Sequence, residues 1–263
     1  MPGHDPRNRS VAMKAELAII GGSGLSSLKM LEIVEREIVH TPYGEPSSPL
    51  VMGTVCGKEV VFLSRHGTSH TIPPHKVNYR ANMWALKNMG VQRVIAVAAV
   101  GGIRADMQPG CIAFPDQIID YTWSRYHTFF ESDLSHVTHI DFTRPYCEEL
   151  RQELLASARG LGLGAVENGT YGATQGPRLE TAAEIKRLER DGCDLVGMTG
   201  MPEAALAREL GLCYASCAVV ANWAAGLGAA EISMDDIDAN LKTGMNKVRR
   251  LFEHLLPAYC PVP

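Results

Sequence analysis

The sequence predicts an α/β fold, in which one domain is built around a central, mostly parallel or mixed β-sheet flanked by helices. Short apolar runs, typical of buried strands, alternate along the 263 residues with amphipathic segments of helical period. Several of these runs end in glycine-rich turns, as strands do where open α/β sheets bind ligands. The sequence has no internal repeat and no linker-like segment, so we expect one domain rather than two.

The elements follow in chain order from this pattern. A near-continuous apolar run at 93–100 predicts a central parallel strand, because such strands are buried on both faces. The other strands are predicted at 17–20, 50–56, 60–63, 111–119, 166–174, 195–196 and 212–220. Amphipathic periodicity and end signals predict helices at 77–89, 145–161, 181–188, 202–211 and 235–256. An irregular segment at 121–142, rich in histidine and aromatic residues, predicts a long functional or interfacial loop.

Composition excludes several classes of protein. A net charge of −4 gives no electrostatic case for a nucleic-acid partner. No apolar run reaches the roughly 20 residues that a membrane span needs. Residues 1–12 lack the apolar core of a signal peptide, and we expect a disordered tail or an expression remnant over residues 1–13. Met13 could then be the native start.

The seven cysteines show neither a CxxC pair nor a zinc spacing. Cys213 and Cys217 would lie about 13 Å apart on a strand that rises roughly 3.3 Å per residue, too far for a disulfide. We therefore expect a reducing cytoplasm. The histidines of the 121–142 loop have no carboxylate or cysteine partners that would complete a metal site, so no metal is expected.

The stretch 194–222 reads as a strand, a loop, a helix and a second strand, and it places polar groups at strand ends. Met198 and Thr199 form the loop after the first strand, and Asn222 ends the second. Pro202 stands where a first helical residue is expected, with Glu203 in the first turn. Because strand ends of an open sheet meet at one edge, these side chains should border one crevice.

Two further motifs could bind an anion. Gly21-Gly-Ser-Gly24 follows the first strand and can present backbone N–H groups, and Arg65-His66 ends a later strand. Taken singly, the turn is equally compatible with a plain tight turn, and the pair with a surface arginine and a core histidine. The turn lacks the third glycine of a dinucleotide-binding loop and the lysine of a P-loop.

Six motifs in order resemble the trimeric purine nucleoside phosphorylases, especially their methylthioadenosine phosphorylase branch, from about residue 17 to residue 257. They are Ile20-Gly-Gly-Ser-Gly-Leu25, Arg65-His-Gly67, His75-Lys-Val-Asn-Tyr-Arg80, Gly176-Pro-Arg178, Val196-Gly-Met-Thr199 and Met201-Pro-Glu203. The resemblance implies a single phosphorylase domain over residues 14–263 that cleaves a purine nucleoside with inorganic phosphate as co-substrate. It also implies a homotrimer in the cytoplasm, with no cofactor and no metal.

The resemblance carries roles to particular residues. Ser23, Arg65, His66, Ala99 and Thr199 match phosphate-binding positions, with His66 also expected to serve catalysis. In the same way Met198 is expected under the ribose, and His139 is expected to reach the site of a neighbouring subunit.

The base site departs from the adenine-specific branch. That branch carries two aspartates, separated by one residue, where this chain has Asn222-Trp223-Ala224. An amide can accept from N7–H and donate to a 6-oxo group, and Glu180 matches the carboxylate that the inosine/guanosine branch places against N1–H. Leu179 stands where a phenylalanine usually packs on the base. We expect Asn222 and Glu180 to act in catalysis by reading a 6-oxopurine, although Glu180 could also be a helix-start charge.

At the sugar end, Met234 and Ile237 replace the histidine that binds a 5′-hydroxyl, and an apolar lining favours a 5′-methylthio group. The expected substrate is therefore 5′-methylthioinosine. Methylthioadenosine and inosine or guanosine remain alternatives within the family. Outside it, a non-catalytic nucleoside-binding module or an NAD-binding domain is the competing hypothesis.

Overall fold

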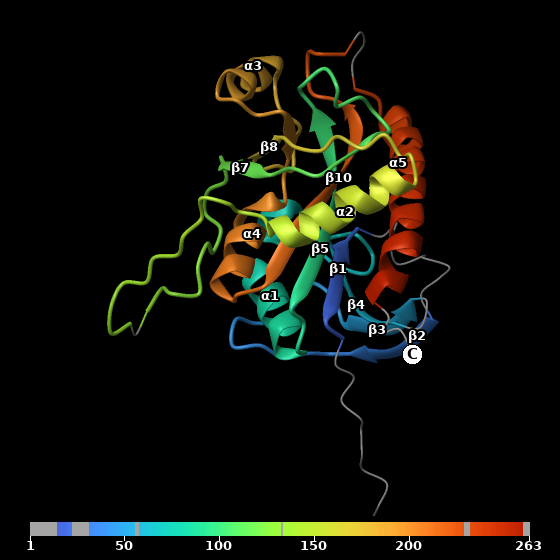
Figure 1. Ribbon diagram of the computed structural model, residues 1–263. Helices are drawn as coiled ribbons and strands as arrows, with labels where there is room; N and C mark the ends of the chain where they lie inside the picture. The colour runs from blue at the N-terminus through green and yellow to red at the C-terminus, as the bar shows by residue number, and fades with distance from the viewer. Residues whose placement is uncertain (1–14, 23–31, 56–57, 133, 229–231, 260–263) are drawn as a thin grey trace, which may run out of the picture.

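A computed structural model of the chain describes all residues except 1–14, 23–31, 56–57, 133, 229–231 and 260–263. The described strands form one mixed sheet in the order β2-β3-β4-β1-β5-β9-β8-β7, with β10 beside β5 and β6 beside β10 (Figure 1). The expected tail over residues 1–13 lies outside the described residues. The strands are β1 (Leu17–Gly21), β2 (Glu32–Glu37), β3 (Leu50–Val55), β4 (Lys58–Ser64), β5 (Arg93–Gly102), β6 (Ile112–Ala113), β7 (Gln117–Asp120), β8 (Thr170–Ala173), β9 (Leu195–Gly197) and β10 (Cys213–Trp223).

The predicted α/β fold is confirmed. In the middle of the sheet, β1 runs parallel to β4 and β5, and β10 runs parallel to β5. The β2–β3–β4 meander is antiparallel, and so is the short β5–β9 pair. Successive β1 residues pack into different clusters, with Leu17 and Ile19 on one face and Ala18 and Ile20 on the other. Both faces are covered, which is why these strands read as continuous apolar runs.

Helices cover the two faces of the sheet in pairs. α1 (Tyr79–Asn88) packs with α4 (Gly200–Glu209) on one face, and α2 (Glu148–Gly160) packs with α5 (Met234–Leu255) on the other (Figure 1). α3 (Ala182–Arg190) begins with a capping box between Thr181 and Glu184. Two 3-10 turns, η1 (Pro74–Lys76) and η2 (Leu256–Tyr259), complete the described helical elements.

The structure corrects three strand predictions. The segment 111–119 is two short strands, β6 and β7, because Pro115 between them has no N–H for a ladder. The exposed strand β2 was not predicted, since it is an edge strand rich in glutamate and arginine without an apolar period. β10 continues to Trp223, beyond the predicted end of the apolar run at residue 220, so Asn222 is the last residue but one of the strand.

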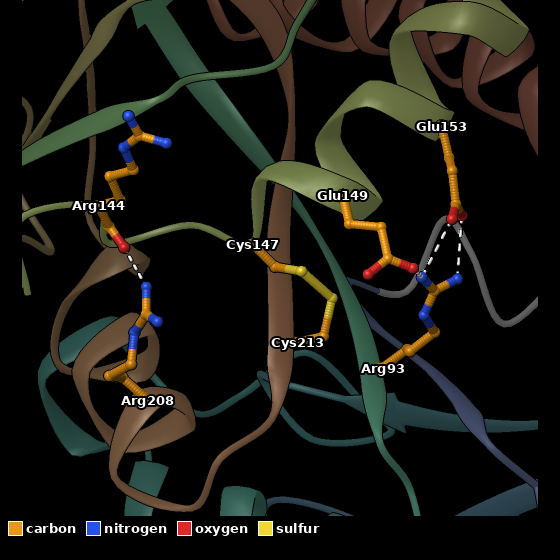
Figure 2. The surroundings of a disulfide bond; sticks show 7 residues. All are labelled: Arg93, Arg144, Cys147, Glu149, Glu153, Arg208 and Cys213. Carbon is orange, nitrogen blue, oxygen red and sulfur yellow. Dashed lines mark hydrogen bonds and ion pairs between the residues drawn. A yellow bond between two sulfur atoms is a disulfide. The ribbon is translucent and has the colours of Figure 1, made fainter.

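A disulfide joins Cys147, just before α2, to Cys213 at the start of β10, with their Cα atoms 5.1 Å apart (Figure 2). Sequence reasoning considered only cysteines close in sequence and so missed this pair, which is separated by 66 residues. Beside the disulfide, Glu149 and Glu153 of α2 pair with Arg93 of β5 (Figure 2). The described free cysteines are Cys111, Cys193 and Cys217.

The segment 121–142 is an irregular loop, as predicted, and it extends away from the sheet at the left of Figure 1. Its base is held by Arg125, whose guanidinium donates to the carbonyls of Met198, Met201, Thr174 and Gln175. Hydrogen bonds from Arg125 therefore attach the loop to the segments that follow β8 and β9. None of the described helices is both long and apolar enough to cross a membrane.

Candidate active site

One cavity of about 940 Å³ opens where the central strands end. Residues after β1, β4, β9 and β10 line it, together with the last half of β5 and one side of α5. This is the edge at which open α/β sheets bind ligands. Residues of four of the six motifs (Gly22, Arg65 and His66, Pro177, and 196–199) therefore meet in space, although they are spread over most of the chain.

At one end of the cavity lie Arg65, His66, Ala99 and Thr199, which we call the Arg65 end. Thr199 is buried at the start of α4, and its N–H donates to the Tyr171 hydroxyl. Ser23 lies outside the described residues, but its neighbour Gly22 lines the same end.

Arg65 is almost wholly buried, with 2% of its side chain exposed. Its Nε and Nη2 donate to the two Glu203 carboxylate oxygens at 2.7 and 2.8 Å, and Nη1 donates to the Val97 carbonyl at 2.9 Å. Burial alone would lower the pKa of Arg65, but the Glu203 charge outweighs it and raises that pKa. Of the five N–H donors of a guanidinium, two are left for an anion in the cavity.

Glu203 is therefore more than the first-turn charge that its sequence position indicated. It is 0% exposed and also accepts from the Tyr214 hydroxyl at 2.9 Å. A buried carboxylate with three donors is a fixed counter-charge, which holds Arg65 in one orientation. Sequence reasoning missed this role because Glu203 and Arg65 are 138 residues apart.

His66 is the second polar group of the Arg65 end. Its Nδ1 lies 2.8 Å from the Ile72 carbonyl oxygen, which can only accept, so Nδ1 carries the proton. Burial, helped by the positive charge of Arg65, lowers the pKa of His66 to about 4. The ring is neutral at pH 7, and its Nε2 is an acceptor. With Nδ1–H turned to Ile72, His66 presents Nε2 as an acceptor, which suits an anion that itself carries a proton.

A second wall of the cavity contains Glu180, Leu179, Asn222 and Ala224, and we call it the Glu180 wall. The β5–β10 pairing shifts register between Val220 and Asn222. The Asn222 amide Nδ2 donates to the Trp223 carbonyl at 2.7 Å, which leaves its Oδ1 available to a ligand. Leu179 is 40% exposed, as expected for a side chain at the mouth of a cavity.

Glu180 accepts one hydrogen bond at this wall, from the hydroxyl of Thr174 at 2.7 Å. Thr174 directly follows β8, and sequence reasoning did not single it out. The signal that could have found it is its place at the end of a predicted strand, just before the Gln175-Gly-Pro motif.

Met198 also lines the cavity, next in sequence to Thr199 of the Arg65 end. A side chain at Gly176, where φ is +61°, would place its Cβ 2.4 Å from the Met198 sulfur. Only glycine fits there, because it tolerates both the left-handed backbone and the close approach.

The third wall of the cavity comes from α5, where the apolar Ile237, Leu241 and Met245 line it together with the charged Asp238, Lys242 and Arg249. Met234, predicted beside Ile237, is 62% exposed and does not line the cavity. It is the first residue of α5, so it lies at the helix tip, whereas the wall is built by the next two turns.

Two other predicted residues also lie away from the cavity of their own chain. Trp223 does not line it, because alternate residues of a strand face opposite sides and its neighbours Asn222 and Ala224 take the cavity side. His139 is exposed on the 121–142 loop. In the described part of the chain, no cluster of three or more His, Cys, Asp or Glu side chains could hold a metal ion.

Comparison with known proteins adds three findings. The family model of the phosphorylase superfamily matches residues 16–257. A probable S-methyl-5′-thioinosine phosphorylase of Pseudomonas syringae pathovar tomato is 54% identical over 241 residues, which cover 92% of this chain and 98% of the relative. A 6-oxopurine nucleoside phosphorylase of Pyrococcus furiosus is 49% identical over 226 residues, 84% of either chain.

Among solved structures, the methylthioadenosine phosphorylase of Schistosoma mansoni bound to adenine superposes with a TM-score of 0.88. It is 34% identical, and the match covers 93% of this chain and 92% of that one. The fold is therefore shared over nearly the whole length.

Proposed function

The chain belongs to the phosphorylase superfamily, and from that premise we propose that it cleaves S-methyl-5′-thioinosine with inorganic phosphate. The products are hypoxanthine and 5-methylthioribose 1-phosphate. The family resemblance drawn from the six motifs is confirmed by the family match and by the similar relatives. The choice of substrate rests on the composition of the Glu180 wall, where a carboxylate and an amide line one cavity with an alanine beside them.

The Glu180 wall suits a 6-oxopurine. Oδ1 of Asn222 accepts from N7–H of the departing base once N7 is protonated, and Glu180 accepts from N1–H, a proton that adenine lacks. Nδ2 of Asn222 keeps one N–H that can donate to O6, since the other is bonded to the Trp223 carbonyl. Ala224 offers no carboxylate to accept from a 6-amino group. An adenine nucleoside would leave buried polar groups unpaired, a mismatch that can cost about 10⁴ in discrimination.

The apolar residues on the α5 side of the cavity favour a methylthio group over a 5′-hydroxyl. The side chains of Ile237, Leu241 and Met245 provide no hydrogen-bond partner, so a 5′-hydroxyl packed against them, and not against their polar neighbours on α5, would be buried unpaired at a cost of about 1–3 kcal/mol. A methylthio group would instead gain from apolar burial there. The preferred 6-oxopurine nucleoside is therefore the 5′-methylthio derivative of inosine and not inosine itself.

The mechanism that we propose has no covalent enzyme intermediate. A phosphate oxygen forms a bond to C1′ while the bond from C1′ to N9 of the base breaks, through a state with oxocarbenium character. The electron pair of that bond stays on the base, which takes up a proton at N7 from water and leaves as neutral hypoxanthine, while the phosphate ester gives its P–OH proton up to water. Arg65, His66, Ala99 and Thr199 surround the phosphate, with the neutral His66 accepting from its P–OH. Asn222 and Glu180 stabilise the departing base, while Met198 packs under the ribose.

We propose that this reaction needs no cofactor and no metal, because the phosphate and the paired protein groups already supply the charge that it requires. Phosphate-dependent release of hypoxanthine should persist after treatment with a chelator. Full activity without phosphate or arsenate, or loss of activity with the chelator, would contradict the proposal.

The oligomer that we propose is a homotrimer in which the 121–142 loop reaches a neighbouring subunit. The support is the apolar surface of that loop, where Trp123, Tyr126 and Val137 are 64%, 65% and 71% exposed. His139, on the same loop, would then contribute to the neighbour's cavity. Light scattering should give three times the chain mass, and an active monomer would sink this part of the proposal.

For the compartment, we propose the cytoplasm, where nucleosides and phosphate are available. The free cysteines Cys111, Cys193 and Cys217 are in keeping with it, and the Cys147–Cys213 disulfide is the opposing observation, since cytosolic disulfides are rare. Thiol titration of the protein in a fresh lysate of the cells that make it should find Cys147 and Cys213 reduced. A persistent disulfide there would argue for another compartment.

The decisive experiment compares kcat/KM of the purified chain for four nucleosides at saturating phosphate. We expect 5′-methylthioinosine to exceed inosine by about 10–200-fold, and 5′-methylthioadenosine by up to about 10⁴-fold. Equal values for inosine would make the chain an ordinary 6-oxopurine nucleoside phosphorylase, the activity in the name of the Pyrococcus relative. Equal values for the adenine nucleoside would refute the argument from the Glu180 wall. The kcat/KM for guanosine, compared with that for inosine, tests whether the Glu180 wall tolerates a 2-amino group.

A further inference from the structure

The carboxylate of Glu180 depends on one neighbouring hydroxyl for its orientation. Among the described residues, Thr174 supplies the side-chain hydrogen bond of Glu180, from Oγ1 to Oε1 at 2.7 Å. Arg178, two residues before Glu180, is engaged elsewhere, because its Nη1 and Nη2 donate to the Glu184 carboxylate at 2.8 Å each. The hydroxyl of Thr174 therefore decides where Oε1 lies.

Thr174 is itself held by the sheet. Its backbone N–H donates to the Gly197 carbonyl at 2.8 Å, and its own carbonyl accepts from Arg125 at 3.2 Å. The hydroxyl also lies 3.2 Å from the Gly197 carbonyl oxygen. Gly197 ends β9 and lines the cavity beside Met198. The hydroxyl position thus comes from the strand ends, whereas Glu180 belongs to the loop that enters α3.

A hydroxyl has one proton to give, so it occupies one of the two carboxylate oxygens. The second oxygen, Oε2, keeps its lone pairs for a ligand in the cavity. The terminal torsion of a glutamate is otherwise broad, and a carboxylate that turns freely presents no fixed acceptor. A hydrogen bond from a fixed hydroxyl sets that torsion before the ligand arrives, which lowers the entropic cost of binding.

We propose that Thr174 is a positioning residue that determines base specificity, because it turns Glu180 so that Oε2 accepts the N1–H of a 6-oxopurine. The inference rests on the proposed function. An adenine nucleoside has a lone pair at N1 and gains nothing from this orientation. Thr174 does not line the cavity, so it acts through Glu180 and not on the substrate itself.

The test compares the wild type with Thr174→Val, which keeps the shape of the side chain and removes its hydroxyl, and with Thr174→Ser, which restores the hydroxyl. Thr170→Val, at the start of the same strand β8, is the matched control. We expect Thr174→Val to lower kcat/KM about tenfold for 5′-methylthioinosine and less than about threefold for 5′-methylthioadenosine. Thr174→Ser and Thr170→Val should stay within about threefold of the wild type for both, and the KM for phosphate should not change.

A double-mutant cycle separates positioning from general support of the fold. In a Glu180→Ala background, Thr174→Val should cause no further loss, because its effect passes through the missing carboxylate. Equal losses on the two nucleosides, or additive losses in the cycle, would overturn the inference while leaving the proposed function intact. Thr174→Ala repeats the test if the valine variant does not fold. A wild-type chain that releases no hypoxanthine overturns the proposed function and this inference together.

Discussion

The Arg65 end and the Glu180 wall hold their charged groups in different ways. At the Arg65 end, a guanidinium that is 2% exposed and a carboxylate that is 0% exposed bind each other through two hydrogen bonds. At the Glu180 wall, a half-buried carboxylate on a loop has one hydroxyl partner, beside a leucine that is 40% exposed.

The two regions should therefore differ in which amino-acid substitutions they tolerate without unfolding. A buried ion pair cannot lose one partner without leaving a charge unpaired in the core, so the Arg65 end is tied to folding. Apart from Ala224, which is 2% exposed, the Glu180 wall contributes little to the core, and its side chains can change with the ligand they face. We therefore expect substitutions at the Arg65 end to affect stability and activity together, and those at the Glu180 wall to affect substrate choice.

The largest expected effect is at Glu203. Glu203→Gln leaves Arg65 buried without its counter-charge and should lower the free energy of unfolding by about 3–5 kcal/mol, as measured by urea titration. The double variant Arg65→Met with Glu203→Leu should recover most of that stability but not the activity. A loss below about 1 kcal/mol in the single variant would show that the pair is not tied to folding, and the comparison would fail.

A switch of base preference should follow at the Glu180 wall. Asn222→Asp combined with Ala224→Asp supplies carboxylates for N7–H and for a 6-amino group. We expect the kcat/KM ratio of 5′-methylthioadenosine to 5′-methylthioinosine to rise about 100-fold, with Asn222→Ala as the control that removes the amide without adding an acceptor. An unchanged ratio would mean that the wall does not read the base.

The third effect is a pH dependence that comes from His66. Its pKa is lowered from 6.5 to about 4 in the folded chain, so the unfolded chain binds its proton more readily between these values. Stability from this group is present above pH 6.5 and is lost as the pH falls towards 4. The full difference between the two pKa values corresponds to about 3 kcal/mol, and solvent screening of the partly exposed ring reduces the expected loss to about 1–2 kcal/mol. His66→Gln should flatten the acid side of the profile of unfolding free energy against pH. His254→Gln, an exposed change on α5, should leave the profile as it is.

The smallest expected effect is at Leu179. Leu179→Phe would place a ring at the mouth of the cavity, where it can stack on the base. We expect the KM for the nucleoside to fall by about 2–10-fold, which corresponds to 0.5–1.5 kcal/mol, with no change in urea midpoint. If the free energy of unfolding changed as much as the free energy of binding, Leu179 would contribute to stability, and the expected difference between the two regions would be wrong.

The sequence by itself determined the fold class and most of the cavity. Apolar runs predicted β1, β5 and β10 because strands covered on both faces must be apolar throughout. Thr199 and Asn222 were predicted to border one crevice because the polar residues at strand ends share one edge of the sheet. Arg65 and His66 were assigned to the same site by the resemblance to the phosphorylases. The exposed strand β2 escaped prediction, since an edge strand has no such requirement.

The tertiary structure decided which groups pair. Arg65 and Glu203 meet across 138 residues, Cys147 and Cys213 across 66, and the proton on His66 is placed by the Ile72 carbonyl. Periodicity reports whether a side chain is buried but not which neighbour it meets, because neighbours depend on strand order and on the paths of loops. Met234 and Trp223 fell outside the cavity for the same reason, since a helix start and a strand face are set by packing.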